Sequence, residues 1–101
     1  MNKKFTSFEA FYPFYLSEHS NVVCRRLHFA GTSLSVICLA MFGATGRWQY
    51  LLFALLFGYA FAWVGHFFFE KNRPATFKYP LYSFAGDWVM YKDIWQGKVK
   101  L

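Results

Sequence analysis

Apolar residues form two long runs in the middle of the chain, separated by a short turn. The first run begins near Val22 and continues to about residue 43, and the second extends from about residue 48 to residue 70. At ~1.5 Å per residue, helices of this length cross the ~30 Å hydrocarbon core of a bilayer. The Gly-containing segment between them is too short for anything but a hairpin turn. We therefore predict two antiparallel membrane-spanning helices, over 22–43 and 48–70.

The segments on either side of these runs are amphipathic. Residues 5–18 are rich in aromatic side chains and are interrupted by Pro13. From residue 81 to residue 96, apolar positions recur at spacings of three, four and seven, as in an amphipathic helix. Both segments predict interfacial helices. The expected fold is all-α, with residues 1–101 forming a single membrane-embedded domain: a membrane helical hairpin with N- and C-terminal amphipathic interfacial helices.

The composition agrees with a membrane protein. The chain is 56% hydrophobic and 25% aromatic, above the ~45–50% apolar content of soluble domains. Its net charge of +6 would suggest nucleic acid on a soluble domain. Here, however, the basic residues flank apolar runs and form no stripe with polar spacers. We expect no nucleic-acid partner, and favour anionic lipid headgroups or an acidic substrate.

The distribution of basic residues predicts the orientation in the membrane. Four Lys or Arg lie before or at the start of the first run, one (Arg47) lies in the hairpin turn, and six follow the second run. Cytoplasmic loops carry the excess of Lys and Arg, so both termini should be cytoplasmic. This describes an integral protein of the inner membrane in a bacterium, or of the endoplasmic reticulum in a eukaryote. The N-terminus lacks the apolar segment of a cleaved signal peptide.

All three histidines fall at the same membrane face in this topology. His19 precedes the first span, His28 lies near its start, and His66 lies near the end of the second. An antiparallel hairpin places these segments together, so the nitrogens of His28 and His66 should lie within about 6 Å of each other, as metal bonds of ~2.0–2.2 Å require. Glu70 follows His66 by one helical turn. Ionisable groups at this depth are costly, which favours a functional site.

The residues alone leave the chemistry open. Histidine and carboxylate ligands suit iron(II), manganese or zinc, and non-haem iron oxygenases use such a set with open coordination positions. A zinc-dependent lipid hydrolase would use similar ligands. A third reading is a non-enzymatic membrane protein that binds lipid or a partner subunit, with Glu70, Lys71 and Arg73 as a stop-transfer charge cluster.

Two segments of the chain carry motifs of a known family. The first is Tyr15-Leu16-Ser17-Glu18-His19-Ser20-Asn21 with Arg25-Arg26-Leu27-His28, and the second is Gly65-His66-Phe67-Phe68-Phe69-Glu70-Lys71-Asn72-Arg73-Pro74-Ala75, with Gly86-Asp87 beyond it. Together they resemble the small membrane proteins of the 2-hydroxy fatty acid dioxygenase family, over about residues 11 to 97. The G-H-x-x-x-E-K-x-R-P-A string is specific to this pattern.

The resemblance implies an enzyme that needs Fe(2+) but no 2-oxoglutarate. It implies that O2 is used to shorten a long-chain 2-hydroxy fatty acid by one carbon, with release of CO2 (fatty acid α-oxidation). His19, His28, His66 and Glu70 fall on motif positions and are the expected catalytic and metal-binding residues. Glu70 is expected either as a ligand or as a partner that orients a histidine N–H.

The resemblance also indicates residues that contact the substrate. Arg73, beside the metal-binding segment, is expected to bind the substrate carboxylate, with Arg25 and Asn21 as further substrate-binding residues. Asp87 falls on another motif position of undefined role. The expected partners are the 2-hydroxy fatty acid, O2 and membrane lipids, and the oligomeric state stays open.

Overall fold

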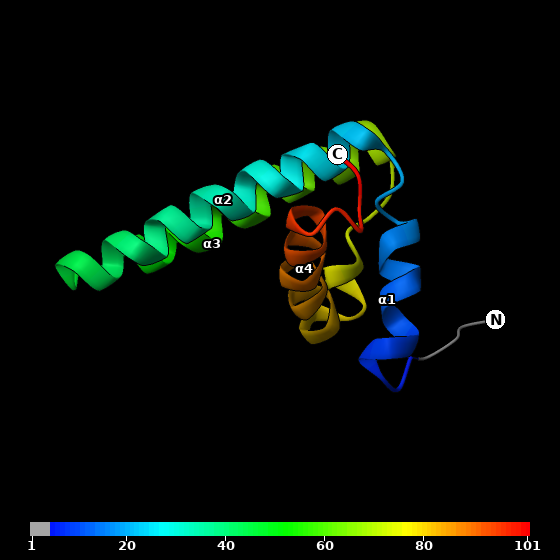
Figure 1. The fold of residues 1–101 in the computed structure, drawn as a ribbon, viewed down its shortest axis with the longest axis horizontal. Helices are drawn as coiled ribbons and strands as arrows, with labels where there is room; N and C mark the ends of the chain where they lie inside the picture. Colours follow the sequence, from blue (N-terminus) through cyan, green and yellow to red (C-terminus); the bar gives the residue numbers. More distant parts are fainter. Residues whose placement is uncertain (1–4) are drawn as a thin grey trace.

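Helices joined by short turns make up residues 5–101, the part of the chain that the computed structural model describes, and no strand occurs there. In chain order the elements are α1 (Phe8–Ser17), α2 (Val22–Thr45), α3 (Gln49–Val64), the π-helix η1 (Gly65–Glu70), the 3-10 helix η2 (Ala75–Phe77) and α4 (Pro80–Trp95). The long α2–α3 hairpin extends to one side, and α1, η2 and α4 gather at its other end (Figure 1). The predicted all-α fold is confirmed.

The α2–α3 hairpin has the length and the surface of two membrane spans. α2 and the continuous helical segment Gln49–Glu70 are both candidate spans, and only 22% of each apolar window is buried within the protein. Large apolar side chains such as Ile37, Leu52 and Leu56 point outward with about half of their surface exposed, at 58%, 45% and 56%. An apolar surface of this extent suits lipid better than water.

Small residues bring the two long helices into contact. A Cβ atom on Gly31 would lie only 2.6 Å from the Cβ of Phe61, so the two backbones approach closely because Gly31 has no side chain. The Ser35 hydroxyl donates a hydrogen bond of 2.5 Å to the carbonyl oxygen of Ala54, which sets the register of the hairpin. Gly31 and Ser35 thus allow close packing of the two helices, whereas a Cβ on Gly43 would have no neighbour within 4 Å.

Both ends of α2 have recognisable caps. The Asn21 side chain accepts hydrogen bonds from the backbone N–H groups of Val23 and Cys24, at 2.8 and 3.3 Å, and so forms the N-cap of this helix. At the other end, α2 continues to Thr45, two residues beyond the predicted boundary. Gly46 then adopts a left-handed conformation with φ of 69°, the usual way for a helix to end.

A small aromatic core joins α1 to α4 at the wide end of the molecule, which is the end opposite the turn of the hairpin (Figure 1). α1 is one continuous helix despite Pro13, and α4 begins with Pro80 at its first position, where a missing N–H is tolerated. The fully or nearly fully buried members of this core are Phe11, Tyr15, Ala75, Met90 and Ile94. Both helices run across the direction of the hairpin in Figure 1. Their placement at a membrane interface stays a prediction.

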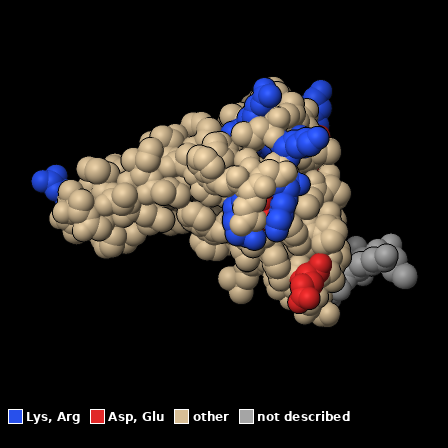
Figure 2. All heavy atoms as spheres, viewed as in Figure 1, with Lys and Arg blue, Asp and Glu red and all other residues tan. Residues whose placement is uncertain are grey.

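Charge is distributed along the molecule as the sequence analysis expected. Lys and Arg side chains gather at the wide end, a single basic residue marks the tip of the hairpin, and the surface between is uncharged in this view (Figure 2). Arg47 is the one Lys or Arg between α2 and α3. The side of the membrane on which each end lies stays a prediction.

Candidate metal centre

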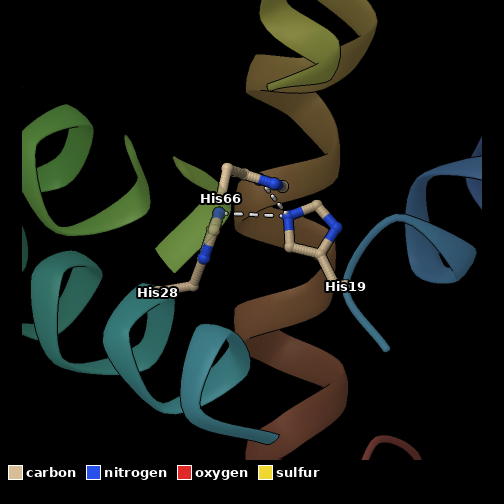
Figure 3. A group of neighbouring side chains, drawn as sticks. All are labelled: His19, His28 and His66. Carbon is tan, nitrogen blue, oxygen red and sulfur yellow. Dashed lines mark hydrogen bonds between the residues drawn. The ribbon is translucent and has the colours of Figure 1, made fainter. Parts of the chain in front are cut away.

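Three histidines from three separate elements point toward one another. His19 lies in the turn after α1, His28 in α2 and His66 in η1 (Figure 3). The Nε2 atom of His19 lies 3.0 Å from the Nε2 atoms of both His28 and His66. The ligand atoms of all three residues lie within 4.8 Å of one another, which confirms the predicted convergence. The three residues are buried, with exposed fractions of 1%, 5% and 2%.

The second ring nitrogen of each histidine contacts an oxygen that can only accept a hydrogen bond. For His19, the Nδ1 atom donates to the backbone carbonyl of Tyr15 at 2.6 Å. For His28, the Nδ1 atom donates to the carbonyl of Cys24 at 3.0 Å. Since a carbonyl has no proton to give, both Nδ1 atoms must carry the ring proton. In the neutral ring, the Nε2 atom is then an unprotonated lone pair.

Asn72 holds His66 in the same way. The Nδ1 atom of His66 lies 2.7 Å from the Asn72 Oδ1 atom, and the Asn72 Nδ2 group donates to the carbonyl oxygen of Glu18 at 3.2 Å. The second contact needs the amide nitrogen on that side, which fixes the oxygen toward His66. All three Nε2 lone pairs therefore face the same small space.

This arrangement fits a divalent transition metal. Burial and the two neighbouring imidazoles hold the pKa of His19 well below its usual range, so its ring is neutral. Three neutral rings protonated at Nδ1 cannot donate to one another through Nε2, and their lone pairs repel. A cation between them would satisfy all three, and an Nδ1–H donated to an oxygen is the usual support of a metal-bound histidine. Iron(II) and zinc both accept imidazole ligands, so the donor set selects a class of metal and no single ion.

The π-helix η1 explains why Asn72 reaches His66. Hydrogen bonds of the i to i+5 type widen this turn, and Lys71 follows with φ of 59°. The chain then reverses, and the Asn72 N–H donates to the carbonyl of His66 at 3.1 Å. An α-helix is expected from the sequence through residue 70, but α3 ends at Val64. The Glu70 carboxylate, four residues after His66, contacts Ser20 and Asn21 at the start of α2.

Glu70 consequently lies apart from the group of ligand atoms. Its carboxylate accepts hydrogen bonds from the backbone N–H of Asn21 and from the Ser20 hydroxyl, the latter at 3.2 Å. The Asn21 side chain also donates to the carbonyl of Phe69 at 3.4 Å. Glu70 and Asn21 thus tie the start of α2 to η1. Among the described residues, the group that could hold a metal ion consists of the three histidines, and the Nδ1 contacts described above do not involve the Glu70 carboxylate.

The two arginines expected at the substrate also lie outside the histidine group. Arg25 donates from Nη1 to the carbonyl oxygens of His19 and Ser20, both at 2.9 Å, and from Nε to the carbonyl of Lys100 at 2.8 Å. Arg25 therefore holds the turn that carries His19 in place through these hydrogen bonds. Arg73 lines a separate hollow together with Lys78 on the side of α1. A role for either arginine in binding substrate stays a prediction.

Asp87 acts on the histidine group through Tyr15. The Tyr15 hydroxyl donates to the Asp87 carboxylate, and the Tyr15 ring stacks on the ring of His19 with 4.2 Å between centroids. A Cβ atom on Gly86 would lie 2.9 Å from the Tyr15 ring, so the Gly86-Asp87 pair both makes room for this tyrosine and anchors its hydroxyl. Burial raises the pKa of Asp87 to about 6. Burial and the nearby Asp87 raise the pKa of Tyr15 well above 10 and keep it a donor.

A cavity of about 260 Å³ adjoins the histidines, between α2, α3 and α4. His28 and Asp87 form part of its wall. The expected metal ligand His28 and the motif residue Asp87 therefore share one hollow. The remaining walls are mostly apolar and belong to the hairpin and to α4.

Sequence reasoning did not assign a role to Asn72 or to Tyr15. Asn72 occupies a variable position of the G-H-x-x-x-E-K-x-R-P-A string, and only its nearness to His66 in the sequence marked it. Tyr15 lies four residues before His19. On a helix, this spacing places the ring and the carbonyl of Tyr15 next to the side chain of His19. That spacing was a usable signal, although tyrosine is common in this aromatic segment.

Comparison with known proteins gives one match. A family model described as 2-hydroxy-palmitic acid dioxygenase Mpo1-like matches residues 5–99. This match confirms the resemblance found from the two motif segments. No curated protein and no solved structure matches the chain.

Proposed function

Because the chain belongs to the Mpo1-like family of 2-hydroxy-palmitic acid dioxygenases, we propose that it is an iron(II)-dependent dioxygenase of 2-hydroxy fatty acids. In this reaction, one 2-hydroxy acid and one O2 give a fatty acid shorter by one carbon, one CO2 and one water, without 2-oxoglutarate. The observation that carries the proposal is the convergence of three Nε2 lone pairs, each on a ring whose Nδ1 proton is held by an oxygen.

The three histidines would hold the iron. Bound there, iron(II) would supply coordination positions for O2 and for the hydroxyl and carboxylate of the substrate. The carbonyls of Tyr15 and Cys24 orient two of the rings, and Asn72 orients the third. The Asp87 carboxyl, with its pKa raised to about 6, can hold a proton at the wall of the adjoining cavity near neutral pH.

The membrane is the proposed source of the substrate. α2 and the segment Gln49–Glu70 are long and apolar enough to cross it, and the histidines lie at the wide, basic end of the hairpin (Figures 1 and 2). A long acyl chain already lies in the bilayer, so its polar head can reach the histidines without transfer of the chain into water. We propose that both termini are cytoplasmic, in the inner membrane or the endoplasmic reticulum.

A zinc-dependent lipid hydrolase is the second candidate, because three histidines also form catalytic zinc sites. It requires an activated water and consumes no O2. A protein that only binds lipid, the third reading of the sequence, requires no metal at all.

The decisive experiment measures metal content and O2 consumption together. Protein purified anaerobically in detergent and loaded with iron(II) should consume O2 with 2-hydroxypalmitic acid and should not do so with palmitic acid. His66→Ala should lose both bound metal and turnover, while Gln96→Ala, at an exposed position outside the site, should retain both. Full activity after chelation, or in His66→Ala, would exclude the oxygenase.

A further inference from the structure

The cavity beside the histidines follows one face of α2. The lining residues of this helix are spaced by four, three and four positions, which places them in a row. They are His28, Thr32, Ser35 and Leu39. The row begins in the histidine group and ends in the apolar part of the hairpin.

The facing row on α3 runs in the opposite direction. Its members include Leu51, Ala54, Gly58 and Ala62. The hydrogen bond from Ser35 to the Ala54 carbonyl sets the register, so that Leu51 lies near Leu39 and Ala62 lies near His28. Three of the six α3 residues that line the cavity are small, namely Ala54, Gly58 and Ala62. A Cβ on Gly58 would already lie 3.2 Å from the Ser35 hydroxyl.

The polarity of the cavity changes from one end to the other. The end at the histidines has an imidazole from His28, a hydroxyl from Thr32 and the Asp87 carboxyl. The other end has only leucines on its walls: Leu39, Leu51 and Leu55. α4 closes the histidine half with Phe84 and Trp88. A ligand with one polar head and one long apolar tail matches this gradient.

The length of the cavity suits a single acyl chain. His28 and Leu39 are eleven residues apart on α2, which corresponds to about 16 Å at ~1.5 Å per residue. One leaflet of a bilayer with a ~30 Å hydrocarbon core is about 15 Å deep. A long-chain fatty acid with its head at His28 would therefore end near Leu39 and Leu51.

We propose that this cavity binds the acyl chain of the substrate and that Leu39 and Leu51 limit the length of chain accepted. The inference rests on the proposed function for the identity of the head group at His28. The occupant is the substrate's own tail, because His28 of the histidine group lines one end of the cavity.

Photo-crosslinking tests the location without requiring turnover. The probe is a 2-hydroxy fatty acid of palmitic length with a diazirine at its terminal methyl end, added to the purified protein in lipid nanodiscs. Labelling should concentrate on Leu39, Leu51 and Leu55, and excess unlabelled 2-hydroxypalmitic acid should suppress it. Labelling spread over outward-facing residues such as Leu52 and Leu56, and insensitive to competitor, would mean contact with bulk lipid only and would overturn the proposal.

A pair of substitutions tests the limit on chain length. Leu51→Trp fills the end of the cavity, whereas Leu52→Trp, the matched control, adds the same ring at a position of similar exposure, 45% against 41% for Leu51, that does not line the cavity. Leu51→Trp should lower kcat/KM for 2-hydroxypalmitic acid about tenfold relative to 2-hydroxyoctanoic acid, as expected when about two methylenes lose their burial. Leu52→Trp should leave that ratio unchanged, and iron content should be equal in both.

The two proposals fail in different ways. If no 2-hydroxy acid supports O2 consumption but the probe still labels the leucine end and Leu51→Trp blocks the label, the acyl site stands and the dioxygenase does not. If Leu51→Trp retains iron, activity and the wild-type preference for chain length, the dioxygenase stands and the acyl site is wrong.

Discussion

Asn72 is the side chain whose removal tests the support of the metal centre most directly. It contacts His66 Nδ1 and is itself held by the Glu18 carbonyl. Asn72→Ala should lower metal affinity by about 10–100-fold, the usual effect of removing the partner of a metal-bound histidine. Competition with a chromogenic chelator measures this change.

Asn72→Asp is the matched variant, because it retains an oxygen that can accept from His66 Nδ1. It should lose much less affinity than Asn72→Ala. Equal losses in the two variants would show that the side chain acts by packing and not by orienting the ring.

Asp87 should make the stability of the protein depend on pH. Burial raises the pKa of Asp87 from 3.8 to about 6 in the folded protein, so between these values the folded state keeps a proton that the unfolded chain has released. The free energy of unfolding therefore falls as pH rises from about 4 to about 6, by about 3 kcal/mol at ~1.4 kcal/mol per pH unit, and stays low above that. Asp87→Asn removes this fall.

Denaturant unfolding at several pH values compares the two proteins. The free energy of unfolding of Asp87→Asn should exceed that of wild type by the smallest amount near pH 4 and by the largest amount above about pH 6. Parallel curves across this range would contradict a buried, ionising Asp87.

The histidines could be predicted from the sequence, whereas the residues that orient them could not. His19, His28 and His66 are the only imidazoles in the chain, and the predicted hairpin alone places them at one end. Asn72 is an uncharged residue at a variable motif position, Tyr15 is one of several aromatic residues in its segment, and two of the three oxygens at Nδ1 belong to the backbone. Every residue has a backbone carbonyl, so the sequence cannot mark the ones that accept a histidine proton. Only the structure identifies them.

At the level of elements, the hairpin followed from hydrophobic pattern and the π-helix did not. The apolar runs predicted α2 and α3 to within two residues at the hairpin turn, because a long run without charges that ends at a Gly-containing turn is visible in the sequence itself. The π-helix begins at Gly65, which packs closely against α2: a Cβ on Gly65 would lie 2.9 Å from the Cys24 sulfur. The hydrophobic pattern carries no signal for this change of geometry, and a metal role for Glu70 stays a prediction.

Gly65→Ala should separate α2 from η1. The added Cβ would lie 3.1 Å from the Cys24 Cα, a backbone atom that cannot rotate away. We expect a loss of about 1–3 kcal/mol in the free energy of unfolding, as for other overpacked sites, together with weaker metal binding. Thermal unfolding in detergent and chelator competition measure the two effects.

Gly43→Ala is the control for the same substitution in the same hairpin. Gly43 lies inside α2 with no neighbour within 4 Å, so alanine should be neutral or should stabilise by up to about 1 kcal/mol. Similar destabilisation by both variants would argue against a specific contact between Gly65 and Cys24.

For the whole molecule, a metal at the histidines would act as a cross-link. Its three ligands belong to the turn after α1, to α2 and to η1, so binding favours the folded arrangement of all three. At a free metal concentration of about 100 times Kd, this linkage is worth about 2.7 kcal/mol. Removal of the metal with a chelator should lower the unfolding temperature, and restoring iron(II) should recover it.

His66→Ala provides the control for that measurement. Its unfolding temperature should not respond to iron(II) or to chelator. A response equal to that of wild type would place the stabilising metal elsewhere in the protein.

Topology is a second property of the whole molecule that can be tested. α1 and the C-terminal residues lie at the same end of the hairpin (Figure 1), and Arg25, near the start of α2, donates a hydrogen bond to the Lys100 carbonyl. Reporter fusions at residue 1, near Arg47 and after Leu101 should therefore report in, out and in. An external C-terminus would mean that α4 crosses the membrane as a third span.

The turn at the tip of the hairpin has a consequence for biogenesis. Between the end of α2 and the start of α3 lie only Gly46, Arg47 and Trp48, so insertion of the proposed spans would carry a single charged side chain across the bilayer. Moving an arginine through the centre costs about 2.5–3.5 kcal/mol on insertion scales, and many apolar side chains of the two helices enter the hydrocarbon at the same time. Such a hairpin can enter the membrane as one unit after synthesis, without machinery that translocates a hydrophilic domain.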